Sequence, residues 1–318
     1  MRISIRARAA VNEVQLSDSF TRRIKNTFGP QGAAWLKTLP KVIAHAKQVY
    51  RLNIVEIFAH QSLNFTAKAT NQHGEECVVK CCMPSIEVIQ EIAALNHMQG
   101  PGMVRLLAAQ EDKGILVLER LTPGMMLSAV KHDVEATKIA ASTMAKLWRP
   151  ITELHHQWKT TQHWFERLDR PSTLPNDFPM QLIDQARAIA RDLHRDMGEA
   201  VLLHGDLHHF NILSASHTSW LAIDPKGVIG ERVYETGAFL RNPLPDIASR
   251  ANIRKTMAIR IDIFSEKLGF DKQRIRAWGF AQAVLAAVWS LDAHSMDYRA
   301  FLVCADAIKS CQSIIYGP

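Results

Sequence analysis

The sequence predicts an α+β fold with a small N-terminal lobe and a larger, mostly helical C-terminal lobe. Up to about residue 118, short apolar runs separated by turns surround one helical segment, which is typical of an antiparallel sheet packed with a helix. Beyond residue 124, apolar residues recur mostly at helical spacing. We therefore expect an N-terminal lobe with leading helices over 1–118, a hinge over 119–124 and a helical lobe over 125–318.

The leading segment is expected to be helical to about residue 52, with a break at Gly29-Pro30. Apolar runs around the turn NQHGEE predict a hairpin. A helix is expected over 85–100, because Ser85 can cap its start and Gly100 can end it. Two further strands are expected around the turn EDKG, which completes the small lobe.

The second lobe is expected to contain several helices and little strand structure. Strand-like segments occur only at 201–204, 211–214 and 220–224, and the last two are joined by the polar turn SASHTS. Helical spacing covers most of residues 127–147, 151–168, 178–197, 251–268 and 273–315.

Composition narrows the class of protein. Of 318 residues, 47% are hydrophobic and 22% are charged, as in ordinary folded proteins. No apolar run reaches the roughly 18 residues of a membrane-spanning helix, and the N-terminal MRISIRARAA lacks the apolar stretch of a secretory signal. The five cysteines form no CxxC pair, so we expect reduced, packed thiols and a cytoplasmic protein.

The net charge of +7 lies mainly in residues 1–118, which carry 14 Lys/Arg and 9 Asp/Glu. Basic chains often bind nucleic acid or other phosphates. This chain has no run of Lys/Arg and no nucleic-acid-binding motif. We expect a small phosphate ligand in the N-terminal part, and neither a nucleic-acid nor a membrane partner.

The stretch LLHGDLHHFNIL, residues 202–213, carries the strongest functional signal. The hairpin formed by NIL and WLAID could set Asn211 and Asp224 side by side, with Asp206 in the loop just upstream. Oxygen ligands of this kind suit Mg²⁺ shared with substrate phosphates. The separations of 5 and 13 positions match a protein-kinase-like catalytic loop.

These motifs, with VVK, EIAAL, LVLERLTPG, GAAWLKTLP and WLAIDPKGVIGERVYETG, resemble the aminoglycoside phosphotransferase family. The resemblance covers about residues 29–245 and is greatest for the branch of streptomycin 6-kinases and hydroxyurea phosphotransferases. Gly205 replaces the usual arginine of the loop, and Asp-Pro-Lys replaces Asp-Phe-Gly. The resemblance implies a two-lobed protein-kinase-like fold that uses Mg²⁺ and ATP, although the sequence does not separate ATP from GTP.

The resemblance assigns roles to individual residues. Asp206 would orient the acceptor hydroxyl and accept its proton, and Asn211 and Asp224 would hold magnesium. Lys80 would contact the α- and β-phosphates and pair with Glu91.

Four further assignments belong to the nucleotide site. Glu87, one helical turn before Glu91, is the alternative partner of Lys80. Lys226 is either a second phosphate contact or a turn lysine. Residues 119–121, with Glu119 and Leu121, would meet the adenine. The phosphate loop would be Ser62, Leu63 and Asn64, in a stretch that contains no glycine.

A cationic acceptor would require carboxylates beyond Asp206. Glu235, close to the site in sequence, is the expected acceptor contact. Three tryptophans could wall the acceptor pocket, although core packing is favoured for them. The other available carboxylates are Glu231, Asp246, Asp292 and Asp297, and the tryptophans are Trp148, Trp158 and Trp164.

Several alternatives remain open. His204, His208 and His209 could suggest zinc, but no second ligand cluster accompanies them, and His204 is expected to pack and steady the loop. The chain could phosphorylate a streptomycin-like aminoglycoside, or hydroxyurea or another small hydroxylated metabolite. It could instead be a nucleotide-binding pseudokinase scaffold. We expect a monomer or a homodimer.

Overall fold

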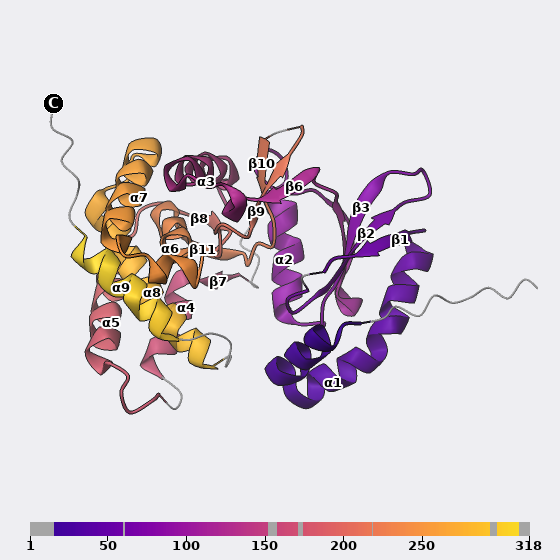
Figure 1. Ribbon diagram of the computed structural model, residues 1–318, viewed down its shortest axis with the longest axis horizontal. Coiled ribbons are helices and arrows are strands. Elements are labelled where there is room, and N and C mark those ends of the chain that lie inside the picture. Colours follow the sequence, from indigo (N-terminus) through magenta and orange to yellow (C-terminus); the bar gives the residue numbers. More distant parts are fainter. Residues whose placement is uncertain are drawn as a thin grey trace, which may run out of the picture.

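The computed structural model describes residues 16–311 except 60, 152–157, 171–173, 218 and 293–297, and it confirms the two-lobed α+β fold (Figure 1). The small lobe contains an antiparallel sheet of strand order β1-β2-β3-β5-β4. Its elements are α1 (Asp18–Val49), β1 (Asn53–Ile57), β2 (Phe65–Thr70), β3 (Glu76–Cys81), α2 (Ile86–His97), β4 (Leu106–Gln110) and β5 (Ile115–Glu119).

Most of the predicted helix ends and breaks in the small lobe lie where the sequence places them. The Ser17 hydroxyl accepts a hydrogen bond from the backbone of Phe20 and caps α1. Gly29 breaks this helix with φ 54° and ψ −132°, at the predicted position. Ser85 occupies the N-cap of α2 but makes no capping hydrogen bond with its side chain, and the helix ends at His97, before Gly100.

The large lobe is mostly helical, but the prediction of only three strand-like segments was wrong. Strands β6, β7 and β11 complete two small sheets of order β10-β9-β6 and β7-β11-β8. The elements are β6 (Pro123–Met126), α3 (Asp133–Leu147), β7 (Lys159–Thr160), α4 (Thr161–Asp169), α5 (Met180–Arg195), β8 (Ala200–Leu203), β9 (Ile212–Ala215), β10 (Ser219–Ala222), β11 (Val228–Glu231), α6 (Thr236–Leu240), α7 (Ile253–Leu268), α8 (Lys272–Asp292) and α9 (Tyr298–Ser310).

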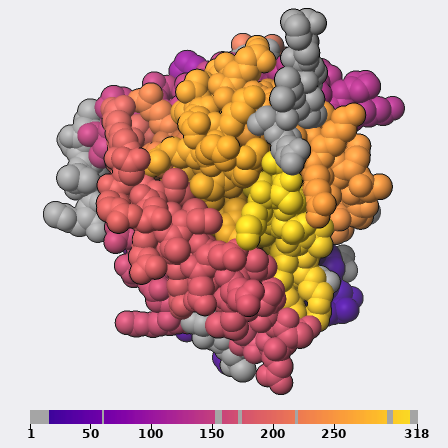
Figure 2. All heavy atoms as spheres, turned by 90° about the vertical axis from the view of Figure 1, so that its left-hand side faces the viewer, coloured from indigo at the N-terminus to yellow at the C-terminus, as the bar shows by residue number. Residues whose placement is uncertain are grey.

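Helix α8 forms the centre of the large lobe, and it is buried on most sides from Trp278 to Val288. Figure 2 shows the outer face of this lobe, where α9 (yellow) lies between α5 (red) and α7 (orange). None of the helices that the structure describes combines the length and the apolar character of a membrane span.

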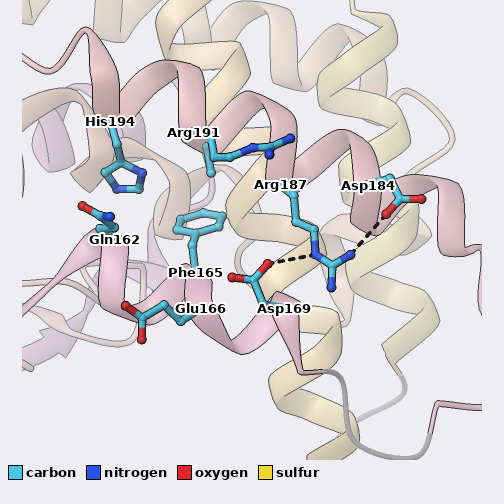
Figure 3. A pocket seen from close by; sticks show the side chains of 9 residues that line it. Gln162, Phe165, Glu166, Asp169, Asp184, Arg187, Arg191 and His194 are labelled. Atoms are coloured by element: carbon cyan, nitrogen blue, oxygen red, sulfur yellow. Dashed lines mark hydrogen bonds and ion pairs between the residues drawn. The ribbon is translucent and has the colours of Figure 1, made fainter.

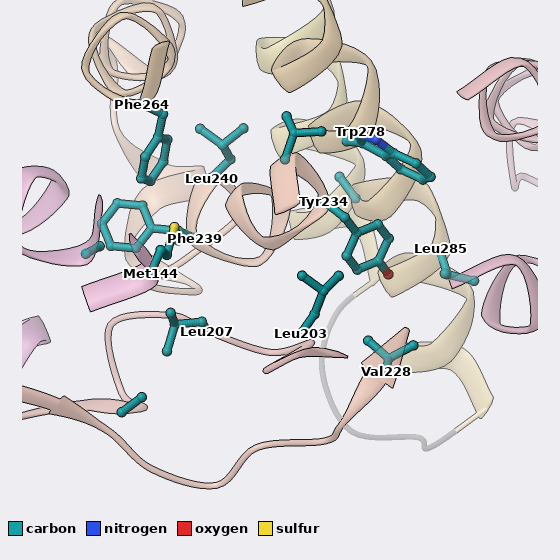
Figure 4. Packing of buried hydrophobic residues seen from close by; sticks show 14 of the residues in the cluster. Met144, Leu203, Leu207, Val228, Tyr234, Phe239, Leu240, Phe264, Trp278 and Leu285 are labelled. Carbon is teal, nitrogen blue, oxygen red and sulfur yellow. The ribbon is translucent and has the colours of Figure 1, made fainter. Parts of the chain in front are cut away.

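Two clusters of buried apolar residues stabilise the molecule. The main core joins the large lobe to α2 and to one face of the five-stranded sheet, through residues such as Leu95 and Leu118. Figure 4 shows its part around Tyr234, Phe239 and Trp278. The second cluster, which we call the α1 core, packs α1 against the other face of the sheet, including Phe65 and Val79. The five cysteines are free and buried, as expected.

Candidate active site

The β9–β10 hairpin presents the predicted catalytic loop at the edge of a small sheet. The register pairs Ile212 with Ala222, and the backbone N–H of Ile223 donates to the carbonyl of Asn211 at 3.0 Å. Asn211 therefore faces Ile223, and Asp224 lies one residue beyond. The predicted hairpin is confirmed, and the expected pairing of Asn211 with Asp224 is shifted by one position.

His204 holds the start of the loop. Its Nε2 lies 2.8 Å from the carbonyl of Ile223, and its Nδ1 accepts from the backbone of Asp206 at 3.3 Å. Burial lowers the pKa of His204 to about 4, so the ring is neutral at pH 7. The Asn211 amide also donates to the Asp206 carbonyl at 3.0 Å. Both side chains fix the backbone around Asp206, and His204 has the steadying position that we expected.

Gly205 stands where protein kinases have arginine, and the structure gives the reason. Its φ of +83° is a conformation that side chains disfavour. A Cβ there would lie 2.8 Å from the Trp164 ring and 2.9 Å from Val228. A larger residue would therefore displace the loop from the core beneath it.

Asp206 is partly exposed, with His208 on one side and Arg241 on the other. His208 Nε2 lies 3.5 Å from one carboxylate oxygen, and Arg241 Nη2 donates to the other at 3.4 Å. Burial would raise the pKa of Asp206, but His208, Arg241 and Lys226 outweigh it and hold this pKa well below its ordinary value. Asp206 is therefore ionised at neutral pH, as a proton acceptor must be.

Lys80 makes one ion pair within the small lobe and a second one that reaches the large lobe. Its Nζ lies 2.6 Å from the carboxylate of Glu91 in α2 and 3.0 Å from that of Asp224 in the large lobe. Burial disfavours the charge on this lysine, but the two carboxylates hold its pKa above the ordinary value. Glu87 is exposed, so the structure brings Glu91 to Lys80.

Asn211 and Asp224 carry the oxygens that a magnesium ion would need. Asp224 has φ 59°, which asparagine and aspartate tolerate better than other side chains do. One of its carboxylate oxygens pairs with Lys80, and the side chain is 39% exposed. The amide nitrogen of Asn211 donates to the loop, which leaves its oxygen for a cation. This pair of hard oxygen donors suits magnesium shared with phosphates.

Gln61 organises the glycine-free turn that is predicted to bind phosphate, and its role was not expected from the sequence. Its amide nitrogen donates to the carbonyls of Phe58 and Thr66, both at 2.8 Å, and its oxygen accepts from the Thr66 backbone at 2.8 Å. Arg23 of α1 donates to the Gln61 carbonyl. The turn is thus fixed by a buried side chain, with Ser62 exposed and Asn64 half-buried beside it.

We predict that Gln61→Ala raises the KM for ATP about tenfold and leaves the KM of the acceptor unchanged. Three hydrogen bonds, each worth about 1 kcal/mol, would be lost from the turn, and a tenfold change in KM corresponds to about half of this total. Steady-state kinetics with each substrate varied in turn measures this effect. Gln72→Ala, an exposed glutamine in the β2–β3 turn, is the matched control. An unchanged KM for ATP in the Gln61 variant would contradict the assignment of this loop to phosphate.

The side chains of Glu119 and Leu121, at and after the end of β5, stabilise the structure and do not face open space. Glu119 is buried, and its carboxylate accepts from the backbone and the Nε of Arg105 at 2.8 and 2.9 Å. Leu121 belongs to the main core. Any contact of these residues with adenine would therefore use their backbone groups, and the hinge role of 119–124 stays a prediction.

Glu235 does not lie where we expected it. It is 1% exposed, and its carboxylate oxygens accept from the backbone N–H groups of His204 at 2.8 Å and Gly205 at 2.9 Å. Both of its oxygens are thus turned to the rear of the catalytic loop. Glu235 is a positioning residue for that loop and does not face an acceptor.

The pKa of Glu235 makes a testable contribution to stability. Burial raises this pKa to about 7, so between pH 4.5 and 7 the folded state binds a proton that the unfolded state lacks. The stabilisation that the protonated Glu235 gives to the folded state is fully present below pH 4.5 and is lost as pH rises through 7. We predict that the free energy of unfolding of wild type, relative to Glu235→Gln, falls by about 3 kcal/mol over this range. Urea unfolding from pH 4.5 to 8 measures it, and parallel curves would contradict it.

The other predicted carboxylates are engaged elsewhere or exposed. Glu231 is buried and pairs with Arg274 at 2.8 Å, and it also accepts from the Trp278 indole. Asp292 pairs with Arg167 at 2.6 Å. Asp246 is exposed, and Asp297 lies outside the described residues.

A cavity of about 390 Å³ opens beside Asp206. Trp289 lines it, and Trp164 packs edge-on behind Trp289 with ring centroids 5.5 Å apart. Of the three tryptophans considered from sequence, Trp164 thus backs the wall, while Trp148 and Trp158 pack against the main core. The lining residues are Asp206, His208, Phe210, Arg241, Asn242, Leu244, Ala286, Trp289, Ser290 and Phe301.

A second cavity, of about 490 Å³, lies between α4 and α5 (Figure 3). The guanidinium of Arg187, which lines this cavity, forms ion pairs with Asp169 and Asp184, both at 3.2 Å. It contains none of the loop residues that can accept a proton or hold a nucleotide. Of the two cavities, the one beside Asp206 therefore contains the predicted catalytic aspartate.

Comparison with known proteins agrees with this geometry. A sequence model described as aminoglycoside/hydroxyurea antibiotic resistance kinase matches residues 52–293. The chain is 25% identical to streptomycin 6-kinase of Streptomyces glaucescens, covering 88% of this chain and 92% of that protein. It is 26% identical to hydroxyurea phosphotransferase of Kitasatospora aureofaciens, covering 83% and 76% respectively.

The fold also matches solved structures. A thermostable mutant of aminoglycoside phosphotransferase APH(4)-Ia, in a ternary complex with ADP and hygromycin B, aligns with a TM-score of 0.60. The alignment covers 86% of this chain and 99% of that chain at 12% identity. At this identity, the likeness concerns the fold.

Proposed function

Because the chain belongs to the aminoglycoside/hydroxyurea antibiotic resistance kinase family, we propose that it transfers the γ-phosphoryl group of ATP to a hydroxyl of a streptomycin-like acceptor. The chain is a phosphotransferase of the protein-kinase-like fold. One observation carries the proposal: an ionised aspartate, Asp206, lines the cavity, and His204 joins its loop to Ile223, next to Asp224, which pairs with the buried Lys80.

The chemistry needs positioning and neutralisation of charge, because the transferred phosphoryl group is loosely bound and highly charged at the transition state. Asp206 would orient the hydroxyl and take its proton. Lys80, held by Glu91, would bind the α- and β-phosphates. Asn211 and Asp224 would hold magnesium, which neutralises phosphate charge when bound. These four groups argue against a scaffold without catalytic activity.

A second acceptor class is favoured by the cavity itself. Among the described lining residues Asp206 is the one carboxylate, and Arg241 and His208 lie beside it. Such a lining offers little attraction to an acceptor that carries several cations. Hydroxyurea, a neutral compound, or another small hydroxylated metabolite is therefore the alternative acceptor.

Consumption of ATP tests both proposals. We expect purified protein with Mg²⁺ and ATP to form ADP stoichiometrically with phosphorylated product when streptomycin, or alternatively hydroxyurea, is added. GTP in place of ATP tests nucleotide choice. If neither compound nor a panel of hydroxylated metabolites raises ADP formation above the rate without acceptor, the kinase proposal is wrong.

A further inference from the structure

Arg241 is a buried cation in the wall of the acceptor cavity. The residue is 6% exposed, and its Nη1 donates to the Gln282 side-chain oxygen at 3.1 Å. Its Nη2 donates to Asp206 at 3.4 Å. Gln282 is itself fixed, because it donates to the Tyr234 carbonyl and packs against Gly237, where any Cβ would lie 2.4 Å from its amide nitrogen. The guanidinium is thus held in place before any acceptor binds.

The guanidinium has bonding capacity left over. It carries five N–H donors. Two are used by the side chains of Gln282 and Asp206, and no other hydrogen bond to this guanidinium is found among the described residues. Buried donors are normally satisfied, by protein, water or ligand. Because Arg241 lines the cavity, an oxygen of the bound acceptor can supply the missing partner.

We propose that Arg241 selects acceptors in which the reacting hydroxyl neighbours a second oxygen. This inference rests on the proposed function, because it assumes that the hydroxyl lies at Asp206. The two side chains are only 3.4 Å apart, so oxygens on adjacent atoms of one molecule can meet both. The hydroxyl donates to Asp206, and the neighbouring oxygen accepts from Arg241.

The ligand class follows from this pairing. It comprises vicinal diols, hydroxy carbonyl compounds and N-hydroxy amides, with an apolar edge against Leu244, Trp289 and Phe301. Both acceptor candidates contain such a pair: hydroxyurea has a carbonyl beside its N-hydroxyl, and aminocyclitols carry hydroxyls on adjacent carbons. Cationic groups of a larger acceptor would lie outside the Arg241 end of the cavity, because like charges repel.

Matched ligands test the proposal by binding, independently of turnover. The probes are hydroxyurea against N-methylhydroxylamine, which is uncharged at pH 8 and lacks the neighbouring oxygen, and trans-1,2-cyclohexanediol against cyclohexanol. Calorimetry gives the Kd of each for protein loaded with Mg²⁺ and a non-hydrolysable ATP analogue. We expect wild type to prefer the member with the second oxygen by about tenfold or more in at least one pair. Arg241→Met should reduce that ratio to about 1, and Arg241→Lys should give an intermediate ratio.

Phe301→Leu is the control, because it alters the apolar wall and should weaken both members of a pair while preserving their ratio. Equal binding of both members by wild type would overturn the proposal without reference to any variant. An unchanged ratio in Arg241→Met, or binding of no probe, would also overturn it. If the ratios behave as expected but no ATP is consumed with any acceptor, the kinase proposal fails and the assignment of Arg241 stands.

Discussion

Replacing Asp206 with asparagine is expected to lower turnover by about 10²- to 10⁴-fold and to leave nucleotide binding nearly intact. The substitution preserves shape but removes the charge that would accept the hydroxyl proton, and positioned proton transfer contributes about this factor. Lys80, Glu91 and Asp224 are untouched, so the Kd for ATP should change by less than about threefold. Single-turnover kinetics and nucleotide titration measure the two effects.

The matched control for Asp206→Asn is Asp246→Asn, an exposed carboxylate outside the cavity lining. It should retain wild-type turnover. Because Arg241 and the other groups near Asp206 hold its pKa low, a loss of wild-type activity as pH falls from 7 to 5 should not come from protonation of this carboxylate. Wild-type turnover in Asp206→Asn would remove Asp206 from the mechanism.

Asp133→Ala is expected to cost about 3–5 kcal/mol of unfolding free energy, the usual cost of leaving a buried charge without its partner. Arg260 is 0% exposed, and its guanidinium binds both oxygens of Asp133, at 2.6 and 2.9 Å. The same guanidinium donates to the carbonyls of Phe239, Leu240 and Asn242, at 2.6–3.2 Å. The pair therefore ties α3 to the segment that reaches the acceptor cavity.

Urea unfolding measures the loss in Asp133→Ala. The control is Asp306→Ala, since Asp306 pairs with Arg254 at 3.0 Å where both side chains are more than 60% exposed. An exposed pair of this kind is worth about 0–1 kcal/mol. Equal losses in the two variants would show that the charge on Arg260 is compensated from elsewhere.

The sequence was most informative where contacts are local or where spacing is shared by a family. The break at Gly29, the hairpin at residues 71–76 and the β9–β10 hairpin depend on neighbouring residues, so their turn residues predicted them. The order of Asp206, Asn211 and Asp224 along the chain was sufficient to suggest the catalytic loop. The one-residue shift of that hairpin was not predictable from its turn residues, and the pairing of β9 with β6 on its other edge has no local signal in the hairpin sequence.

Residues that act over long distances in sequence were missed or misassigned. Arg241 reaches Asp206 across 35 positions, and nothing around it in the sequence marks it. Gln61 fixes its turn by hydrogen bonds to Phe58 before it and to Thr66 after it. A phosphate loop is usually recognised by its glycines, and this stretch has none. Glu235 was expected to face the acceptor because of its closeness in sequence. The chain after β11 instead directs the Glu235 carboxylate toward the backbone N–H groups of His204 and Gly205.

The continuity of the main core has a consequence for folding. The chain passes from one lobe to the other near residue 119, but the apolar interior does not divide there, because α2 and one sheet face share it with the large lobe. The two lobes therefore form one cooperative unit in unfolding. The α1 core is separate, so α1 can detach in a subglobal opening that leaves this unit intact. The family model begins to match at residue 52, after α1 has ended, so this opening would leave the matched residues folded.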